Sequence, residues 1–263
     1  MLAGFIQSGA DGKGVEVVLV RDLDMGSHNI TLSTSFESIS NCTFNGNNHT
    51  IANYTLSNKQ YAGLLPNAIR VTVKNLTLKN ANITAVNDGS NNAYAGGFIG
   101  RAYGTNVVEN CTLENSIVQG INKVGGIAGF QAENGISIRK CTVKGSTIKV
   151  DTENQEYGQC GGILGYIGSV AAANEVSGNF IINTKVEAPA NTNIGEEHRK
   201  SSICVGTLQG VKGQSLVIDM PFSYIQSSTF NGKTIDKTEY MGLLGGIRYE
   251  ETQPSLTING TRF

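Results

Sequence analysis

A repeated glycine-centred segment is the feature that most constrains this 263-residue chain. A small residue, Gly, two apolar residues and Gly form the pattern, which is clearest at residues 96–100, 125–129 and 161–165. Weaker copies lie at 62–66, 205–209 and 241–245. The second residues, at 63, 97, 126, 162, 206 and 242, are 34, 29, 36, 44 and 36 positions apart. One such unit cannot bury an apolar face alone, so stacked units must share a continuous core.

Short strand-like segments follow these glycines and suggest how the units align. The clearest read Asn-Leu-Thr-Leu at 75–78, Asn-Cys-Thr-Leu at 110–113 and Lys-Cys-Thr-Val at 140–143, with a first copy, Asn-Cys-Thr-Phe, at 41–44. Later copies are degraded, as in Asn-Phe-Ile-Ile at 179–182. We expect Cys42, Leu76, Cys111 and Cys141 to form one inward column, with Asn45, Lys79, Glu114 and Lys144 in an outward one. A unit of three short strands and turns, with a period in the thirties, is typical of one coil of a parallel β-helix.

The sequence therefore predicts an all-β protein, a right-handed parallel β-helix of about seven coils. At a strand spacing of about 4.8 Å this rod would be roughly 35 Å long. We expect the repeated glycines at a tight corner that needs a positive φ. Leu2, Phe5 and Ile6 suggest a short N-terminal capping helix, so we predict a cap over 1–14 and a single β-helix domain over 15–263.

Composition excludes several other classes of protein. Gly contributes 33 residues and charged residues only 16% of the chain, which does not suit a coiled coil or helical bundle. With 39% hydrophobic residues and a net charge of -1, the chain is not of the disordered type and has no basic stripe for nucleic acid. No apolar stretch reaches the roughly 20 residues needed to span a bilayer.

Two segments resemble a known family. Residues 44–51, Phe-Asn-Gly-Asn-Asn-His-Thr-Ile, are similar to the F-D-G-N-G-H-T-I segment of bacterial surface β-helix proteins, and residues 17–25 resemble their v-t-L-t-x-D-I-D-M strand. In those proteins glycine units called GLUG motifs follow, as at 96–100, 125–129 and 161–165 here. Asn45, Asn48, Pro66 and Gln209 depart from the pattern. The resemblance, over about 15–250, implies a secreted or surface-attached bacterial β-helix and carries over no catalytic residue.

Cysteine and histidine patterns give no support for a metal site or cofactor. There is no Cys-x-x-Cys, and His28, His49 and His198 have no second ligand at metal-binding spacing. Stacking would bring Cys111 near Cys141 and Cys160 near Cys204, within disulfide reach, but we favour buried thiols that act as small apolar groups. Eight Asn-x-Thr triplets occur and several of them recur with the repeat, so we interpret their Asn residues as left-handed corners rather than glycosylation sites.

An enzyme is the less favoured interpretation. Polysaccharide lyases and hydrolases need carboxylates clustered on consecutive coils. Asp22 and Asp24 share a strand face but have no evident partner in the next coil. Tyr61, Tyr94, Tyr157 and Tyr240 precede the repeated glycines, where they could stack on sugars, although we favour a role in covering a corner of the solenoid.

The best interpretation is a non-catalytic, secreted or cell-surface β-solenoid that acts as an adhesin-like binding module for a glycan or a host or surface protein. A polysaccharide lyase or hydrolase and a structural spacer in a larger surface protein are the alternatives. We expect a monomer or part of a larger chain.

Ligand contacts are expected on a loop edge formed by the linkers at 86–93, 120–123, 151–159, 187–202 and 226–239, because loops on a rigid scaffold carry function. The candidate ligand-binding residues there are Tyr157, Glu196, Glu197, His198 and Arg199.

Overall fold

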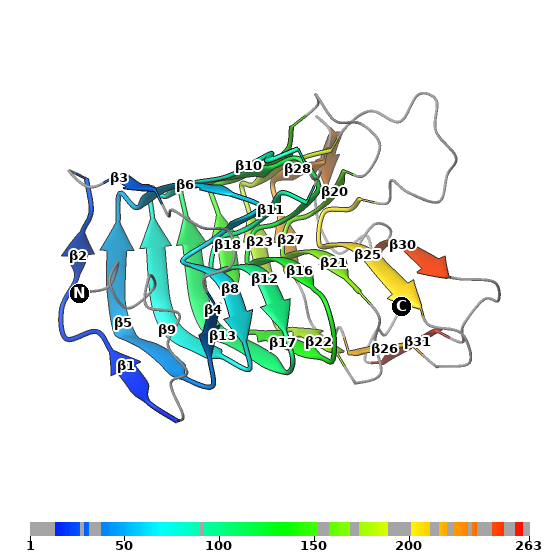
Figure 1. Cartoon of the computed structure of the whole chain (residues 1–263). Coiled ribbons are helices and arrows are strands. Elements are labelled where there is room, and N and C mark those ends of the chain that lie inside the picture. Colours follow the sequence, from blue (N-terminus) through cyan, green and yellow to red (C-terminus); the bar gives the residue numbers. More distant parts are fainter. Residues whose placement is uncertain are drawn as a thin grey trace.

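The computed structural model describes residues 14–26, 29–31, 38–89, 92–151, 158–168, 174–188, 201–210, 216–219, 224–230, 233–235, 244–249 and 256–259. Every regular element in these ranges is a β-strand. The strands stack into a rod whose successive coils follow the sequence from one end to the other (Figure 1). The predicted capping helix and the boundary of the 1–14 cap concern mainly residues 1–13, which lie outside the described residues.

Four sheets run along the rod, and each coil visits them in turn. Sheet 1 contains β1 (Glu16–Val18), β2 (Leu23–Asp24), β5 (Thr43–Ala52), β9 (Thr72–Lys79), β13 (Asn106–Glu114), β17 (Ile136–Arg139), β18 (Thr142–Lys144), β22 (Asn174–Ser177), β23 (Phe180–Ile182), β26 (Leu216–Asp219), β27 (Tyr224–Gln226) and β31 (Leu256–Asn259). Sheet 2 contains β3 (Asn29–Thr31), β6 (Thr55–Lys59), β10 (Asn82–Val86), β14 (Ile117–Gly120), β19 (Thr147–Val150), β24 (Lys185–Glu187), β28 (Ser228–Phe230) and β29 (Lys233–Ile235).

The remaining two sheets are built from the repeated glycine segments. Sheet 3 contains β7 (Tyr61–Ala62), β11 (Tyr94–Gly96), β15 (Lys123–Gly125) and β20 (Gln159–Gly161). Sheet 4 contains β4 (Ser38–Ser40), β8 (Leu65–Ile69), β12 (Ile99–Tyr103), β16 (Ala128–Gln131), β21 (Leu164–Ile167), β25 (Val205–Gly210) and β30 (Leu244–Tyr249). A complete coil thus has four strand positions rather than the predicted three, because the glycine pair splits its segment into two short strands.

Parallel pairing from coil to coil confirms a parallel β-helix. Along sheet 1 the path from β1 through β5, β9, β13, β17, β22 and β26 to β31 makes seven steps, in agreement with the predicted seven coils. Only β29 pairs antiparallel among the described strands, in a hairpin with β28. The predicted linker 226–239 therefore contains two strands of sheet 2.

Alternate side chains of the strands fill the core. In β13, buried and partly exposed side chains alternate along the sequence both before and after Asn110. Val108, Cys111 and Leu113 are fully buried. Full burial of an aliphatic side chain is worth about 1.5–3 kcal/mol. The core is therefore a stack of such layers that runs the length of the rod.

Left-handed residues form columns at two bends of sheet 1. The φ values are 51–63° in one column and 46–59° in the other. The first column is Asn48, Asn75, Asn110, Lys140 and Gly178, and the second is Asn53, Asn80, Asn115, Gly145, Asn183 and Ser227. Asn is the non-glycine residue that best tolerates this conformation. The interpretation of the Asn-x-Thr triplets is confirmed at 41, 48, 53, 75 and 110, where Asn has a positive φ.

The repeated glycines are needed for a different reason than predicted. Neither Gly97 nor Gly126 has a positive φ, so that prediction is wrong. A Cβ at Gly97 would lie 2.4 Å from the carbonyl oxygen of Gly126, and one at Gly126 would lie 2.1 Å from that of Gly162. Glycine is required because the backbones of adjacent coils approach too closely for any side chain.

Two predicted columns are out of register. Asn45 pairs with Lys74 and His49 with Leu76, because the segment at 46–48 bulges opposite Asn75. Cys42 therefore does not stack on Leu76, nor Asn45 on Lys79. The inward column at this position is His49, Leu76, Cys111 and Cys141, although His49 itself is partly exposed.

The sixth coil is also displaced from its predicted alignment. Val205 pairs with Leu164, which places Ile203 rather than Gly206 beside Gly162. Cys160 pairs with Val124 and lies next to Ser201, so Cys160 and Cys204 form no column. The 44-residue step in the predicted spacing arose from this displacement, since Gly206 matches the last glycine of the preceding unit and not its second.

Substitution of the corner glycines tests their close approach. Gly126→Ala should lower the free energy of unfolding by about 1–3 kcal/mol or more, because the new Cβ would overlap a carbonyl oxygen of the next coil. Gly120→Ala is the matched control, since its Cβ would lie no closer than 3.1 Å to any neighbouring atom. Urea denaturation of both variants measures the difference, and equal losses would contradict this packing.

Candidate functional site

The sequence-predicted ligand residues cannot be placed. Tyr157, Glu196, Glu197, His198 and Arg199 all lie outside the described residues. The linkers after β10, β14 and β19 each join sheet 2 to sheet 3, so they leave the rod at one corner as expected. A ligand on this loop edge stays a prediction.

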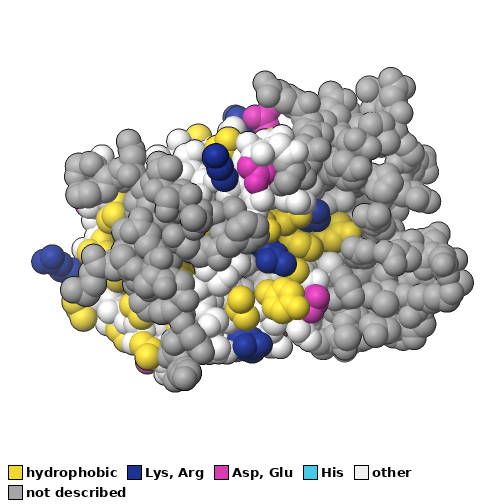
Figure 2. Space-filling view, viewed as in Figure 1, with side chains coloured by type: hydrophobic (Ala, Val, Ile, Leu, Met, Phe, Trp, Pro, Cys, Tyr) yellow, Lys and Arg dark blue, Asp and Glu magenta, His cyan; other side chains and the backbone are white. Residues whose placement is uncertain are grey.

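Beside the loop edge lies a cluster of aromatic rings and two cations, here called the aromatic–lysine cluster. It consists of Tyr61, Tyr94 and Lys123 from sheet 3 and Arg101, Phe130 and Tyr166 from sheet 4. The Tyr61 and Tyr94 rings are stacked with centroids 5.4 Å apart, and Phe130 bridges from Tyr94 (4.9 Å) to Tyr166 (5.5 Å). Figure 2 shows hydrophobic side chains interspersed with Lys and Arg over β12, β16 and β21.

The two cations cover the rings of this cluster. Lys123 Nζ lies 4.6 Å from the centroid of Tyr94, 5.0 Å from that of Phe130 and 4.9 Å from that of Tyr166. Tyr61 and Tyr94 are each only 7% exposed, and burial raises the pKa of Tyr94 to about 12. The interpretation of Tyr61 and Tyr94 as residues that cover a corner is therefore confirmed, and their faces are not open to a sugar.

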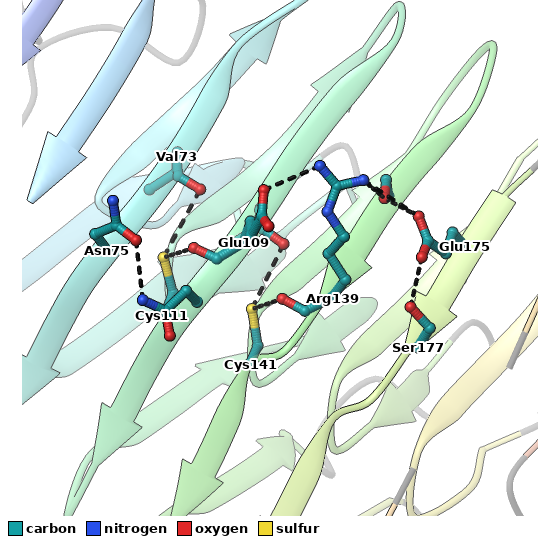
Figure 3. Close-up of polar contacts among 11 residues, drawn as sticks. Val73, Asn75, Glu109, Cys111, Arg139, Cys141, Glu175 and Ser177 are labelled. Carbon is teal, nitrogen blue, oxygen red and sulfur yellow. Dashed lines mark hydrogen bonds and ion pairs between the residues drawn. The ribbon is translucent and has the colours of Figure 1, made fainter. Parts of the chain in front are cut away.

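The outer face of sheet 1 carries regular rows of polar side chains, one residue from each coil. A charged row contains Asn45, Lys74, Glu109, Arg139 and Ser177. Arg139 lies 2.9 Å from a carboxylate oxygen of Glu109 and 3.5 Å from one of Glu175 (Figure 3). The hydrogen bond from Arg139 lowers the pKa of Glu109. Charges of opposite sign thus alternate along the rod and stabilise neighbouring coils.

A second charged row lies on the far side of the same face. Glu114 is flanked by Lys79 at 3.5 Å and Lys144 at 3.2 Å, from the preceding and following coils. The predicted alternation of Lys79, Glu114 and Lys144 is confirmed. Together with the pair of Lys74 and Glu16, the ion pairs of this face join four cations to four carboxylates.

Between the two charged rows runs an uncharged one, here called the Thr–aromatic row. It begins with four partly exposed threonines and ends with two aromatic residues, in register throughout: Thr50, Thr77, Thr112, Thr142, Phe180 and Tyr224. Phe180 is 43% exposed and Tyr224 38% exposed, and their ring centroids are 6.0 Å apart. Two large rings therefore face solvent where the earlier coils carry threonine.

Phe180 lies on the outer face, although the weaker copy at 179–182, aligned on its Asn, would match Phe180 with the inward Cys141. Phe180 pairs instead with the outward Thr142, and Asn179 takes the inward position. A slip of one residue exchanges the two faces of a strand. The buried Asn179 amide donates to the carbonyl of Ile138 and accepts from the N–H of Cys141, both at 2.9 Å. Gly178, the left-handed residue of this coil, is the sequence signal that gives the correct register.

The two aspartates that share a strand face, Asp22 and Asp24, are engaged in structural contacts. Asp22 accepts hydrogen bonds from the N–H of Thr50 (2.8 Å) and lies 3.1 Å from His49 Nδ1, and Asp24 accepts one from Asn53 (2.8 Å). The pKa values of Asp22 and Asp24 are lowered chiefly by the bonds from Thr50 and Asn53. Both aspartates thus have polar partners in the next coil, which the sequence did not reveal.

The described part of the chain offers neither a metal-binding cluster nor a membrane-spanning helix. No group of three or more His, Cys, Asp or Glu side chains there could hold a metal ion. No helix long and apolar enough to cross a bilayer occurs in those residues either. All five cysteines are buried free thiols. Cys111 and Cys141 are neighbours in register, and burial raises the pKa of Cys111, as suits a small apolar group.

Residues 91–118 match the family model described as the GLUG motif. The chain carries a GLUG motif. In the structure this motif spans one coil, from β11 through β12 and β13 to the start of β14, and its glycines are those that pack backbone against backbone. The resemblance of the glycine unit at 96–100 to a GLUG motif is thereby confirmed.

One solved structure is similar along nearly the whole rod. It is the crystal structure of a "putative immunoglobulin A1 protease from Bacteroides ovatus", with a TM-score of 0.56 and 18% sequence identity. The similarity covers 95% of this chain and 79% of that one. At this identity it shows a shared β-helix fold. No curated protein matches the sequence significantly.

Arg139 gives a prediction for acid stability. Its hydrogen bond lowers the pKa of Glu109, so the pair stabilises the fold at neutral pH and this stabilisation is lost as the pH falls through the acid range. Because Arg139 and Glu109 are about one third exposed, Arg139→Gln should cost only about 0.5–1 kcal/mol at pH 7.

Urea denaturation at a series of pH values measures this effect. The difference between the wild type and Arg139→Gln should begin to shrink below about pH 4.3, the ordinary pKa of Glu, and approach zero only below the lowered pKa of Glu109. Lys149→Gln, on a strand of sheet 2, is the control. A difference that does not depend on pH would contradict the role given to the ion pairs.

Proposed function

We propose that this chain is a non-catalytic, adhesin-like binding module, secreted or held at a bacterial surface, and that its ligand contacts the exposed pair Phe180 and Tyr224. The observation that carries the proposal is the departure of this pair from the repeat. Threonine suffices at the four preceding positions of the row, and large apolar side chains open to water do not add to the core. Exposed aromatic residues on a polar surface are typical of binding contacts.

Electrostatics favour binding over hydrolysis at this face. A glycosidase of the usual type needs one carboxyl group with a raised pKa to act as the general acid. On this face the pKa values of Glu109 and Glu175 are both lowered; for Glu175, burial raises the pKa, but hydrogen bonds from Ser137 and Ser177 and the charge of Arg139 outweigh it. These carboxylates stay ionised and paired, which suits a rigid surface. Turnover of pectin-like polymers in the presence of Ca²⁺ would instead support the lyase alternative.

The location outside the cell rests on the GLUG motif and its resemblance to surface β-helix proteins. The Bacteroides protein in the structural comparison is described as a protease, and at 18% identity that activity is not carried over to this chain. A structural spacer would share the fold and the location, and it differs from a binding module in that the isolated domain binds nothing.

A variant that restores the repeat tests the proposal. Phe180→Thr with Tyr224→Thr replaces both rings by the residue that the row carries in earlier coils, so the fold should be preserved. Arrays of glycans and of host and bacterial surface proteins identify a ligand of the wild type. The double variant should bind that ligand at least tenfold more weakly, a loss of about 1.4 kcal/mol.

Ile117→Thr is the matched control. Ile117 is 42% exposed, as Phe180 is at 43%, but it lies on sheet 2 and outside the loop edge. The control should bind as the wild type does. Undiminished binding by the Phe180 and Tyr224 variant would exclude this pair and leave the loop edge as the candidate surface.

A further inference from the structure

We infer that the ligand of the Thr–aromatic row is a linear, uncharged glycan that lies along the axis of the rod. This inference rests on the proposed function and specifies its ligand. It starts from the alignment of six outward side chains from six consecutive coils in a single row.

The direction of the row points to an extended polymer. Neighbouring positions are separated by one strand spacing, about 4.8 Å. This spacing is close to the length that one pyranose unit adds to an extended glycan. A linear chain can therefore present successive sugar units to successive coils without a change of register.

The chemistry of the row suits a sugar. Pyranose rings have apolar C–H faces, which pack on the faces of aromatic rings, and hydroxyl groups at their edges. Phe180 and Tyr224 offer two such rings with centroids 6.0 Å apart, inclined by 59°, so that each ring can take its own sugar unit. The hydroxyl groups of Thr77, Thr112 and Thr142 can each donate and accept a hydrogen bond.

The charge balance of the ion pairs that flank the row points to a neutral polymer. Within the ion pairs that flank the row, four cations face four carboxylates, so the pairs present no net charge to a polyanion. Glu114 lies between two lysines and Arg139 between two glutamates, which keeps these charges engaged. An acidic glycan would have to break these contacts, whereas a neutral one would not.

Isothermal titration calorimetry of the whole chain with defined oligosaccharides tests the inference. The probes are hexamers of β-1,4-glucose, β-1,3-glucose, α-1,4-glucose, β-1,4-xylose and β-1,4-mannose, with a hexamer of galacturonic acid as the acidic comparison. At least one neutral hexamer should bind, more tightly than its dimer. Phe180→Thr with Tyr224→Thr should weaken this binding at least tenfold, and Ile117→Thr should not.

A smaller change tests the threonine part of the row. Thr142→Val keeps the shape of the side chain and removes its hydroxyl group, and it should weaken binding of the same hexamer severalfold. Thermal melts of all variants confirm that they are folded.

Three results would overturn the inference. If only the galacturonic acid hexamer binds, the ligand is not neutral. If no hexamer binds, but a protein from the arrays binds through Phe180 and Tyr224, the glycan inference fails and the proposed binding function stands. If a neutral glycan binds equally well to the wild type and to the Phe180 and Tyr224 variant, the inference fails and so does the assignment of the ligand to this pair, which leaves the loop edge as the candidate surface.

Discussion

The backbone contact between successive coils is the constraint on which the rest of this structure depends. At each bend of sheet 1 a left-handed residue donates its N–H to a carbonyl of the next coil, as Asn80 does to Glu114 and Asn115 to Lys144, both at 2.9 Å. At the opposite side the glycine segments bring backbones together with no room for a Cβ. These two devices keep the ladder of hydrogen bonds continuous around the corners, where a loop would otherwise leave polar groups unpaired.

Side-chain order follows from this backbone order. Because the coils are held in one register, every outward position is repeated at the strand spacing, and like residues form rows. The side-chain amide of Asn110 donates to that of Asn75 at 2.9 Å, and opposite charges alternate around Arg139 and Glu114. A departure from a row is then visible as a local change on a regular surface. The pair Phe180 and Tyr224 is such a departure, which is why it carries the functional argument.

The architecture could be predicted from the sequence because its causes are local. The glycine units and the Asn-x-Thr triplets recur at the period of one coil, and they gave the fold class and the number of coils. Register failed where the period changes. The bulge at 46–48 shifts Cys42 out of its predicted column, and the pairing of Val205 with Leu164 in the sixth coil shifts Cys204. Neither shift could be predicted, because neither changes the local sequence pattern of the segment that is shifted.

The candidate site depended on that register and was missed for this reason. The pattern Asn-Phe-Ile-Ile looked like another Asn-Cys-Thr-Leu, which placed Phe180 in the core. One alignment matches Phe180 with Cys141 and the other matches it with Thr142. They are distinguished by the left-handed residue that must precede the strand, which is Gly178 in this coil. The position of Phe180 is thus a global property of the stacked coils and not a property of its own segment.

A disulfide cross-link between Thr142→Cys and Phe180→Cys tests the central claim most directly, because it reports the register that creates the row. Residues paired on adjacent parallel strands lie about 4.8 Å apart, within the range of Cα distances that a disulfide spans. With the five native cysteines replaced by alanine or valine, this pair should oxidise readily. The pair Cys141 with Phe180→Cys, retaining only that native thiol, should stay reduced. The opposite outcome would place Phe180 in the core and contradict the account.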